Sequence, residues 1–374
     1  MEQSIIDYIK WRGDLTLKQV SFNEIDALIL SELSYVNFKD IVPENFCTKE
    51  ITLKDAVKNY FEAPDIMERT KSILFIDTTL IEMIQLLEDS NRFNKMKLCG
   101  YTDSLDSTNE KQFAAMTINL GDGSFFISYR GTDDSLIGWK EDFNMAFLTP
   151  VPSQLEALKY LTKASSSLRG KIRLGGHSKG GNVAVYAATF CSAKIKRRII
   201  DIYNNDGPGF ESNIISSKEF KSISNKLHTF VPQTSIVGLL LDHKEEHTII
   251  LSNEKGLMQH NPFSWQLNGP KFLEVESLSK ESILIDKTIH QWLKEMTLEQ
   301  RENFVDALFE ILTSSKATTL TELAENWTRN PIHALKAVLS LDETTRHIVW
   351  KALQRLVISA KDNLPPLSSL LDKK

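Results

Sequence analysis

Apolar positions in the first part of the chain recur at intervals of three and four residues, the spacing of one face of a helix. Residues 23–33 place Ile25, Leu28, Ile29 and Leu33 in this way. Residues 69–87 repeat the spacing over a longer stretch, at Ile73, Ile76, Leu80, Met83, Ile84 and Leu87. The pattern predicts that residues 1–93 are a mostly helical lead-in, and no catalytic motif is evident in them.

From Leu98 onward the apolar positions form short runs bounded by turns, which is typical of strands. Residues 113–120 and 124–129 are two such runs, and Gly121-Asp122-Gly123 between them predicts a hairpin turn. Further strands are predicted at residues 198–204, 227–232, 237–241 and 248–251, the last two paired across the charged turn at 242–247. Helices are predicted at residues 153–168 and 179–192. Strands that alternate with helices indicate an α/β fold with mainly parallel central strands.

Helical patterns return after about residue 278 and continue along the rest of the chain. Thr297-Leu298-Glu299-Gln300 and Thr319-Leu320-Thr321-Glu322 both fit the capping box that begins helices. We therefore expect an α/β domain at residues 1–277 and a helical C-terminal appendage at residues 278–374. This appendage is expected to pack on the domain or on a partner.

The composition narrows the class of protein. The 374 residues carry a formal charge of −5, with 41% hydrophobic and 25% charged residues, as in ordinary soluble proteins. This modest acidic balance argues against a nucleic-acid-binding surface. The cysteines Cys47, Cys99 and Cys191 form neither a disulfide framework nor a zinc motif. No basic segment followed by an apolar run opens the chain, and no stretch approaches about 18 apolar residues. We expect a cytoplasmic protein without a transmembrane segment.

A glycine-flanked serine lies between an apolar run that begins at Ile172 and a helix of small residues. Gly176-His177-Ser178-Lys179-Gly180 matches the G-x-S-x-G nucleophile elbow, a sharp strand-to-helix turn that exposes its serine. The turn strains the serine backbone, so Gly176 and Gly180 beside it must be almost free of side chain. The motif predicts Ser178 as a nucleophile, and the alternative is a glycine-rich structural turn.

A serine hydroxyl needs an imidazole to take its proton and a carboxylate to orient that imidazole. In an elbow fold the partners follow the serine in the order acid, then histidine. Asp206 ends the next predicted strand, at the edge where ligand-facing groups gather in α/β sheets. The Gly207-Pro208-Gly209 turn after it can fix its backbone. Asp242, in the charged turn, is the alternative acid.

Among the eight histidines, His260 follows the last predicted strand on a loop, as a triad histidine should. The alternative for His260 is a hydrogen-bonded structural histidine, and a packing role is expected for His177. The oxyanion hole needs two backbone N–H groups. Lys179 is expected to supply one and Thr132 the other, unless Thr132 is only a turn residue. This chemistry requires no cofactor and no metal.

Tyr129-Arg130-Gly131-Thr132, followed by Trp139, Asp142 and the elbow, resembles the class 3 lipase pattern of the α/β-hydrolase superfamily. Over nearly its full length the chain is similar to a bacterial family of lipase-like hydrolases related to these lipases. Residues 7–14, 231–238 and 259–265 carry this similarity. The resemblance implies an α/β-hydrolase-like sheet with lipase or esterase chemistry.

Two positions depart from the class 3 lipase pattern. Ser235 stands where those lipases have their acid, so either the acid has moved to Asp206 or the triad is broken. Pancreatic-type lipases have an Asp-x-Pro turn after the strand that follows the nucleophile, and Asp206-Gly207-Pro208 is similar. Lys179 replaces the usual leucine, which puts a charge beside the expected oxyanion site. Activity on long-chain fats therefore does not follow from the resemblance.

The favoured hypothesis is a serine hydrolase that cleaves an ester or thioester through an acyl-enzyme on Ser178. One alternative is a non-catalytic hydrolase-like scaffold that binds a ligand or a protein partner, with the C-terminal helices as a surface for that partner or for self-association. A remote alternative is a zinc hydrolase, since His243, Glu246 and His247 match an H-x-x-E-H motif. That motif needs both histidines on one helical face, whereas strand-like runs flank it here.

Overall fold

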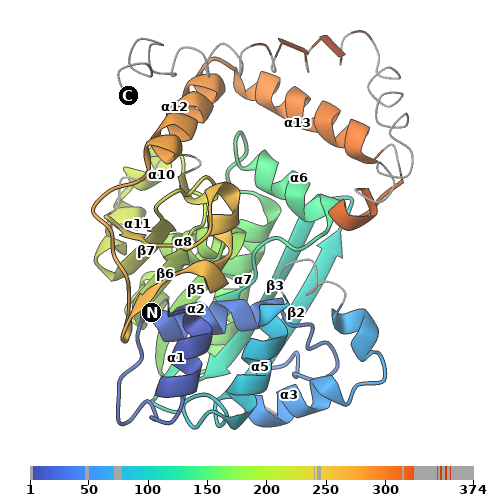
Figure 1. The fold of residues 1–374 in the computed structure, drawn as a ribbon. Helices are drawn as coiled ribbons and strands as arrows, with labels where there is room; N and C mark the ends of the chain where they lie inside the picture. The colour runs from blue at the N-terminus through green and yellow to red at the C-terminus, as the bar shows by residue number, and fades with distance from the viewer. Residues whose placement is uncertain are drawn as a thin grey trace.

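The computed structural model describes residues 3–46, 50–70, 78–239, 241, 246–313 and 316–323, with six separate positions between 343 and 354. Among these residues an eight-stranded sheet runs through the molecule, with its strands side by side in chain order (Figure 1). They are β1 (Ile51–Thr52), β2 (Lys97–Asp106), β3 (Lys111–Asn119), β4 (Ser124–Tyr129), β5 (Lys171–His177), β6 (Ile199–Asn205), β7 (Leu227–Pro232) and β8 (His247–Ile250). The first four pair antiparallel, and β4 to β8 are parallel. The predicted α/β fold with mainly parallel central strands is confirmed.

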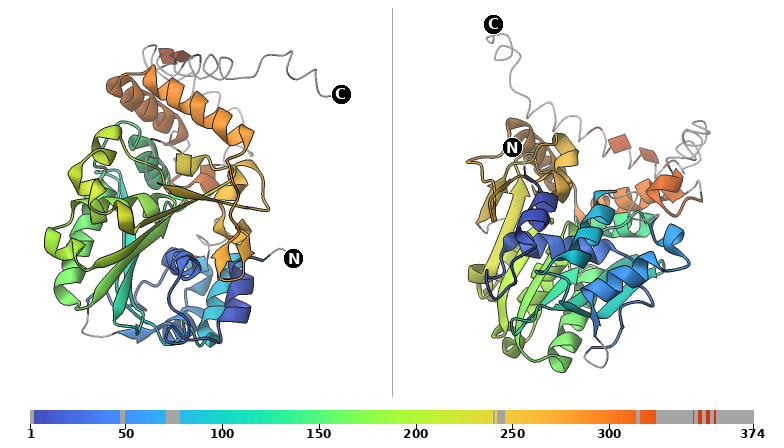
Figure 2. Two further views of the ribbon diagram at one scale, coloured as in Figure 1. Left: turned by 90° about the vertical axis from the view of Figure 1, so that its left-hand side faces the viewer. Right: turned by 60° about the horizontal axis from the view of Figure 1, so that its bottom comes forward.

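One face of the sheet is covered by the helices that connect its parallel strands. Because these strands are neighbours in the chain, right-handed crossovers bring all their helices to the same face. Figure 2 shows this layer, formed by α7 (Pro152–Ser167), α8 (Lys179–Phe190), α9 (Ala193–Lys196), α10 (Ser212–Ile215) and α11 (Lys218–Lys221). The predicted helices at residues 153–168 and 179–192 correspond to α7 and α8. The small residues of α8 allow it to lie close to the sheet, and it is buried over almost its whole length.

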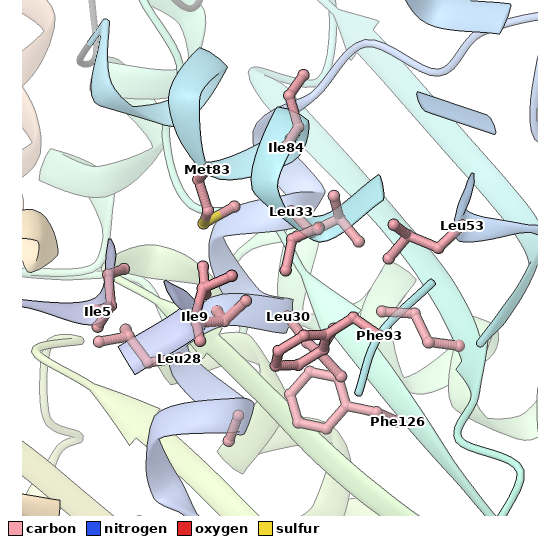
Figure 3. Packing of buried hydrophobic residues seen from close by; sticks show 14 of the residues in the cluster. Ile5, Ile9, Leu28, Leu30, Leu33, Leu53, Met83, Ile84, Phe93 and Phe126 are labelled. Carbon is pink, nitrogen blue, oxygen red and sulfur yellow. The ribbon is translucent and has the colours of Figure 1, made fainter. Parts of the chain in front are cut away.

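The opposite face receives no crossover and is covered by the N-terminal helices. These are α1 (Ile5–Arg12), α2 (Glu24–Glu32), α3 (Leu53–Phe61) and α5 (Thr79–Asp89). Figure 3 shows their apolar side chains packed around Phe93 and Phe126, and Phe126 comes from β4. The predicted helix at residues 23–33 is confirmed as α2, and the one at 69–87 corresponds in its second half to α5. Residues 71–77 lie outside the described part of the chain.

A buried ion pair fixes α2 in this layer. Asp26 on α2 and Arg92 are both fully enclosed and share two hydrogen bonds of 2.5 and 2.6 Å. The guanidinium also donates to backbone carbonyls of the loop between α1 and α2. Burial raises the pKa of Asp26, and Arg92 acts against that rise. Since a buried charge needs its partners in place, this network holds α2, and with it Glu32, against the sheet.

The strand predicted at residues 248–251 is present as β8, but the strand predicted at 237–241 and its pairing with 248–251 are wrong. Val237–Leu239 forms a short 3-10 helix, η3, instead of a strand. β8 consequently has no hairpin partner there and lies parallel to β7. The cause is local, because the N–H of Gly238 donates to Ser235 Oγ and a β-carbon on Gly238 would clash with Asp206. This segment folds over the end of β6, which an apolar run in the sequence does not reveal.

The C-terminal helices lie at the end of the sheet where the parallel strands finish, and the later one packs beside α6 (Leu136–Asn144; Figure 1). They are α12 (Lys280–Lys294) and α13 (Leu298–Thr313). Lys140 on α6 pairs with Asp306 at 2.7 Å, and Arg301 donates to the carbonyl of Ala146 at 2.7 Å. Apolar side chains seal the contact: Met296, Phe304, Val305 and Phe309 against Trp139 and Phe147. The division of the chain at residue 277 stays a prediction.

Thr297 and Gln300 exchange hydrogen bonds of 3.2 Å between side chain and backbone, so the first predicted capping box is present. No helix in the described ranges combines the length and the apolar character needed to cross a membrane.

Candidate active site

Ser178 occupies the turn between β5 and α8 with φ 57° and ψ −135°. A non-glycine residue in this region stores roughly 1–3 kcal/mol of backbone strain, which the surrounding structure must hold. The serine N–H donates to the carbonyl of Asn205 at the end of β6, and its own carbonyl accepts from Gly181. These bonds fix the nucleophile elbow against the neighbouring strand.

The glycines on either side of Ser178 are required by space. A β-carbon on Gly176 would lie 2.5 Å from the carbonyl oxygens of Gly180 and Tyr129. A β-carbon on Gly180 would clash with the same Tyr129 oxygen and come within 3.0 Å of the Gly131 nitrogen. The start of α8, the end of β4 and the segment after β4 therefore meet at the elbow.

Asp206 follows β6 directly, and its carboxylate is completely buried. Its Oδ2 lies 2.6 Å from Nδ1 of His260, and its Oδ1 accepts a hydrogen bond of 2.5 Å from the Ser235 hydroxyl. Its backbone N–H donates to the carbonyl of Phe230 on β7. The structure thus brings together two of the residues selected from the sequence, Asp206 and His260. The alternative acid, Asp242, lies outside the described residues.

His260 ends the short helix η4 (Gly256–His260), and about a quarter of its side chain is exposed. With Nδ1 directed at Asp206, the proton on that nitrogen is held by the carboxylate and Nε2 is left with its lone pair. Among the described residues no hydrogen bond joins Nε2 to Ser178 Oγ. Such contacts commonly form only in the complex with substrate.

The segment after β4 adjoins Ser178. A β-carbon on Gly131 would lie 3.1 Å from Cβ of Ser178, so Thr132 is one residue from direct contact with the elbow. Lys179 is the first residue of α8, where a backbone N–H has no partner inside the helix. The Thr132 hydroxyl donates to Asp142 and is not free to act as a third donor.

The Lys179 side chain turns into the protein, away from solvent. Its ammonium bonds the side-chain oxygen of Gln112 at 2.6 Å, the Gln112 carbonyl at 3.1 Å and Glu141 at 3.0 Å. Glu141 in turn accepts the backbone N–H groups of Gln112 and Ser153. The charge expected beside an oxyanion hole is therefore balanced by a buried carboxylate, and it ties the elbow to β3 and α6.

Asp142, next to this pair, is a carboxylate with a raised pKa. Burial raises the pKa of Asp142 to about 6, while nearby Lys179 and the Thr132 hydroxyl oppose the rise. Its Oδ1 lies 3.8 Å from the Lys179 ammonium and has no hydrogen bond. Near neutral pH the residue can accordingly change charge within reach of the elbow.

No role was predicted for Glu141 or Ser235. Nothing in the local pattern marks Glu141, which is one of several acids on α6. For Ser235 the available signal was its position, where class 3 lipases have an acid. Of the zinc motif, residues 243–245 lie outside the described residues, and His247 begins β8. Within the described part of the chain no group of three or more His, Cys, Asp or Glu could hold a metal.

A strained serine between a strand and a helix, with an acid after the next strand and a histidine on a later loop, defines an α/β-hydrolase-like protein. A family model described as Mbeg1-like matches residues 87–310, which is more than half of the chain. The chain belongs to this family. Among curated proteins none matches the sequence.

Several solved lipase structures match part of the chain. M37 lipase is 18% identical, with 58% of this chain and 70% of that chain covered and a TM-score of 0.35. A fungal lipase in complex with an inhibitor is 13% identical, with 55% and 83% covered and a TM-score of 0.35. Lipase from Rhizopus microsporus var. chinensis is 15% identical, with 65% and 87% covered and a TM-score of 0.35. At these values the matches carry no weight for the reaction or the substrate of this chain.

Proposed function

We propose that this protein is a serine hydrolase that cleaves an ester or thioester through an acyl-enzyme on Ser178. The observation that carries the proposal is the 2.6 Å contact between the buried Asp206 carboxylate and Nδ1 of His260, beside a serine with positive φ. A buried carboxylate on Nδ1 sets the tautomer in which Nε2 can accept a proton, which is the requirement for a general base. The cytoplasmic location expected from the sequence forms part of this proposal.

In the proposed reaction, Ser178 Oγ attacks the acyl carbon while His260 Nε2 takes the hydroxyl proton. The resulting imidazolium is stabilised by Asp206. Collapse of the tetrahedral intermediate breaks the bond to the alcohol or thiol, which leaves with the proton from His260. Water then attacks the acyl-enzyme and loses a proton to His260. Collapse of this second tetrahedral intermediate breaks the bond to Ser178 Oγ, which takes the proton back from His260, and the carboxylic acid is released.

The negative charge on the tetrahedral intermediate needs donors that are already in position. The backbone N–H of Lys179 is a suitable donor because it begins α8 and has no helical partner. The N–H of Thr132 is the second candidate, since its neighbour Gly131 adjoins Ser178. The bond from the Thr132 hydroxyl to Asp142 would hold that loop in place.

A second candidate function is a non-catalytic scaffold that binds a ligand or partner. The observation in its favour is that no hydrogen bond joins Ser178 Oγ to His260 among the described residues. The two candidates differ in one measurable property, which is the reactivity of Ser178 toward an electrophile.

Covalent labelling by a fluorophosphonate probe tests the proposal. The wild type should be labelled, Ser178→Ala should not be, and Asp206→Asn should be labelled about 10⁴-fold more slowly. Ser166→Ala, at an exposed serine on α7, is the matched control and should be labelled like the wild type. Folded wild-type protein that takes up no probe would instead support the scaffold. A series of nitrophenyl esters and thioesters of increasing acyl length would then define the substrate.

A further inference from the structure

A second carboxylate–histidine pair lies buried directly behind His260. His177, the last residue of β5, places its ring against the His260 ring, with centroids 4.6 Å apart and an angle of 34° between the planes. Its Nε2 is 2.9 Å from the backbone carbonyl oxygen of His260, and its Nδ1 is 3.2 Å from Oε1 of Glu32. Glu32 ends α2 and is fully enclosed, and His177 is nearly so.

The positions of the oxygens fix how many protons this pair holds. A carbonyl oxygen can only accept, so Nε2 of His177 must carry a hydrogen and donate to His260. A neutral ring would then turn the lone pair of Nδ1 toward a carboxylate oxygen at 3.2 Å, and two acceptors at that distance repel. A proton between Nδ1 and Oε1 removes the conflict. Glu32 and His177 together therefore hold one proton more than a carboxylate and a neutral imidazole.

The surroundings favour a ring without charge. Burial and the neighbouring His260 lower the pKa of His177 well below its usual value. Because one proton lies between Nδ1 and a carboxylate oxygen, the pair of Glu32 and His177 carries no net charge. Tyr35, whose hydroxyl is 3.5 Å from the same nitrogen, is also buried and un-ionised, because burial raises its pKa. His260 can thus become an imidazolium during a reaction without facing a second cation.

We propose that Glu32 and His177 position the general base of the site. The Nε2–H of His177 holds the backbone of His260, its ring supports one face of the His260 imidazole, and Glu32 fixes the tautomer that makes this possible. Asp206 then orients the imidazole from one side and His177 from another. The inference rests on the proposed serine hydrolase, and it makes α2 part of the catalytic apparatus.

Four variants of the full chain test this role. His177→Leu removes the donor to His260, whereas His177→Gln offers an N–H at nearly the position of Nε2. We expect His177→Leu to lower kcat about 100-fold with KM changed less than about threefold, because small displacements of a catalytic group are costly. His177→Gln should recover at least about tenfold of that loss. Likewise Glu32→Gln, which can donate to Nδ1, should turn over at least about tenfold faster than Glu32→Leu.

The readouts are steady-state hydrolysis of nitrophenyl acetate and the rate of fluorophosphonate labelling, with circular dichroism to verify folding. A wild type that is neither labelled nor active would overturn the proposed function and this role with it. A labelled wild type with an equally active His177→Leu would overturn the positioning role alone. Equal losses in His177→Leu and His177→Gln would also overturn it, because the N–H would then be irrelevant. If His177→Leu does not fold, the Glu32 pair and His177→Gln decide the question by the same comparison.

Discussion

Replacing Lys179 by methionine would leave Glu141 as a buried carboxylate without a counter-charge. The side chains of Lys179 and Glu141 are 1% and 0% exposed, and the ion pair between them measures 3.0 Å. Removing one partner of such a pair costs about 3–5 kcal/mol, since the remaining charge is uncompensated. The carboxylate keeps two backbone donors, from Gln112 and Ser153, so the lower figure is expected for Lys179→Met.

Glu141→Leu should be more damaging than Lys179→Met. It leaves the ammonium without its carboxylate and also deprives two backbone N–H groups of their acceptor. Each buried donor left unsatisfied costs about 1–3 kcal/mol, which brings the expected loss to about 5 kcal/mol or more. The double variant Lys179→Met/Glu141→Leu should be destabilised less than the sum of its single changes, because the two residues are in contact.

Urea denaturation followed by tryptophan fluorescence gives these differences in the free energy of unfolding. Lys58→Met is the matched control, because Lys58 and Glu62 form an exposed ion pair at 3.9 Å and its loss should cost no more than about 0.5 kcal/mol. A Lys179→Met variant within about 1 kcal/mol of the wild type would refute the reasoning. So would strictly additive losses in the double variant.

Three further changes probe the surroundings of Ser178. Since the pKa of Asp142 is raised to about 6, the free energy of unfolding should fall as the pH rises from about 4 to about 6, by less than about 3 kcal/mol because a quarter of the side chain is exposed. Asp142→Asn should abolish that fall. Equal slopes of melting temperature against pH in the wild type and in Asp142→Asn would contradict this. Gly131→Ala would place a β-carbon 2.6 Å from the His177 carbonyl oxygen, so fluorophosphonate labelling should slow at least about 100-fold. An unchanged labelling rate would show that the segment at Gly131 does not affect the reactivity of Ser178. Ser235→Ala removes a hydrogen bond to the Asp206 carboxylate that is worth about 1.5–3 kcal/mol, so kcat should drop about 10- to 100-fold. Ser235→Thr should retain most of the wild-type kcat. Equal kcat values for all three proteins in steady-state kinetics would exclude a role of Ser235 in orienting Asp206.

Local patterns predicted the parts of the fold that local forces decide. The hairpin at Gly121-Asp122-Gly123 and the strand, turn and helix around Ser178 follow from turn chemistry and residue size, and all are present. Asp206 and His260 were selected by their order in an elbow fold, and they lie in contact. Strand order was sufficient for these two residues because Asp206 directly follows β6 and His260 lies in the segment after β8.

Contacts between distant segments could not be predicted in the same way. Glu32 contacts His177 only because α2 covers the face of the sheet that the crossover helices leave uncovered. The residues next to Glu32 in the sequence do not reveal this contact. The direction of the Lys179 side chain depends on Gln112 and Glu141, far away in sequence. The run at residues 237–241 is apolar enough for a strand, yet the contact of Gly238 with the acid loop decides its shape.

The N-terminal helices that cover one face of the sheet also limit where the chain can be truncated. The family match begins at residue 87, after most of the helices that cover the face bearing Phe126. A fragment cut at that boundary would keep Ser178, Asp206 and His260 but would expose a broad apolar surface, which favours aggregation. It would also lack Glu32. The smallest fragment expected to fold therefore includes the N-terminal helices. Fusions or truncations that contain only the matched segment should yield insoluble protein.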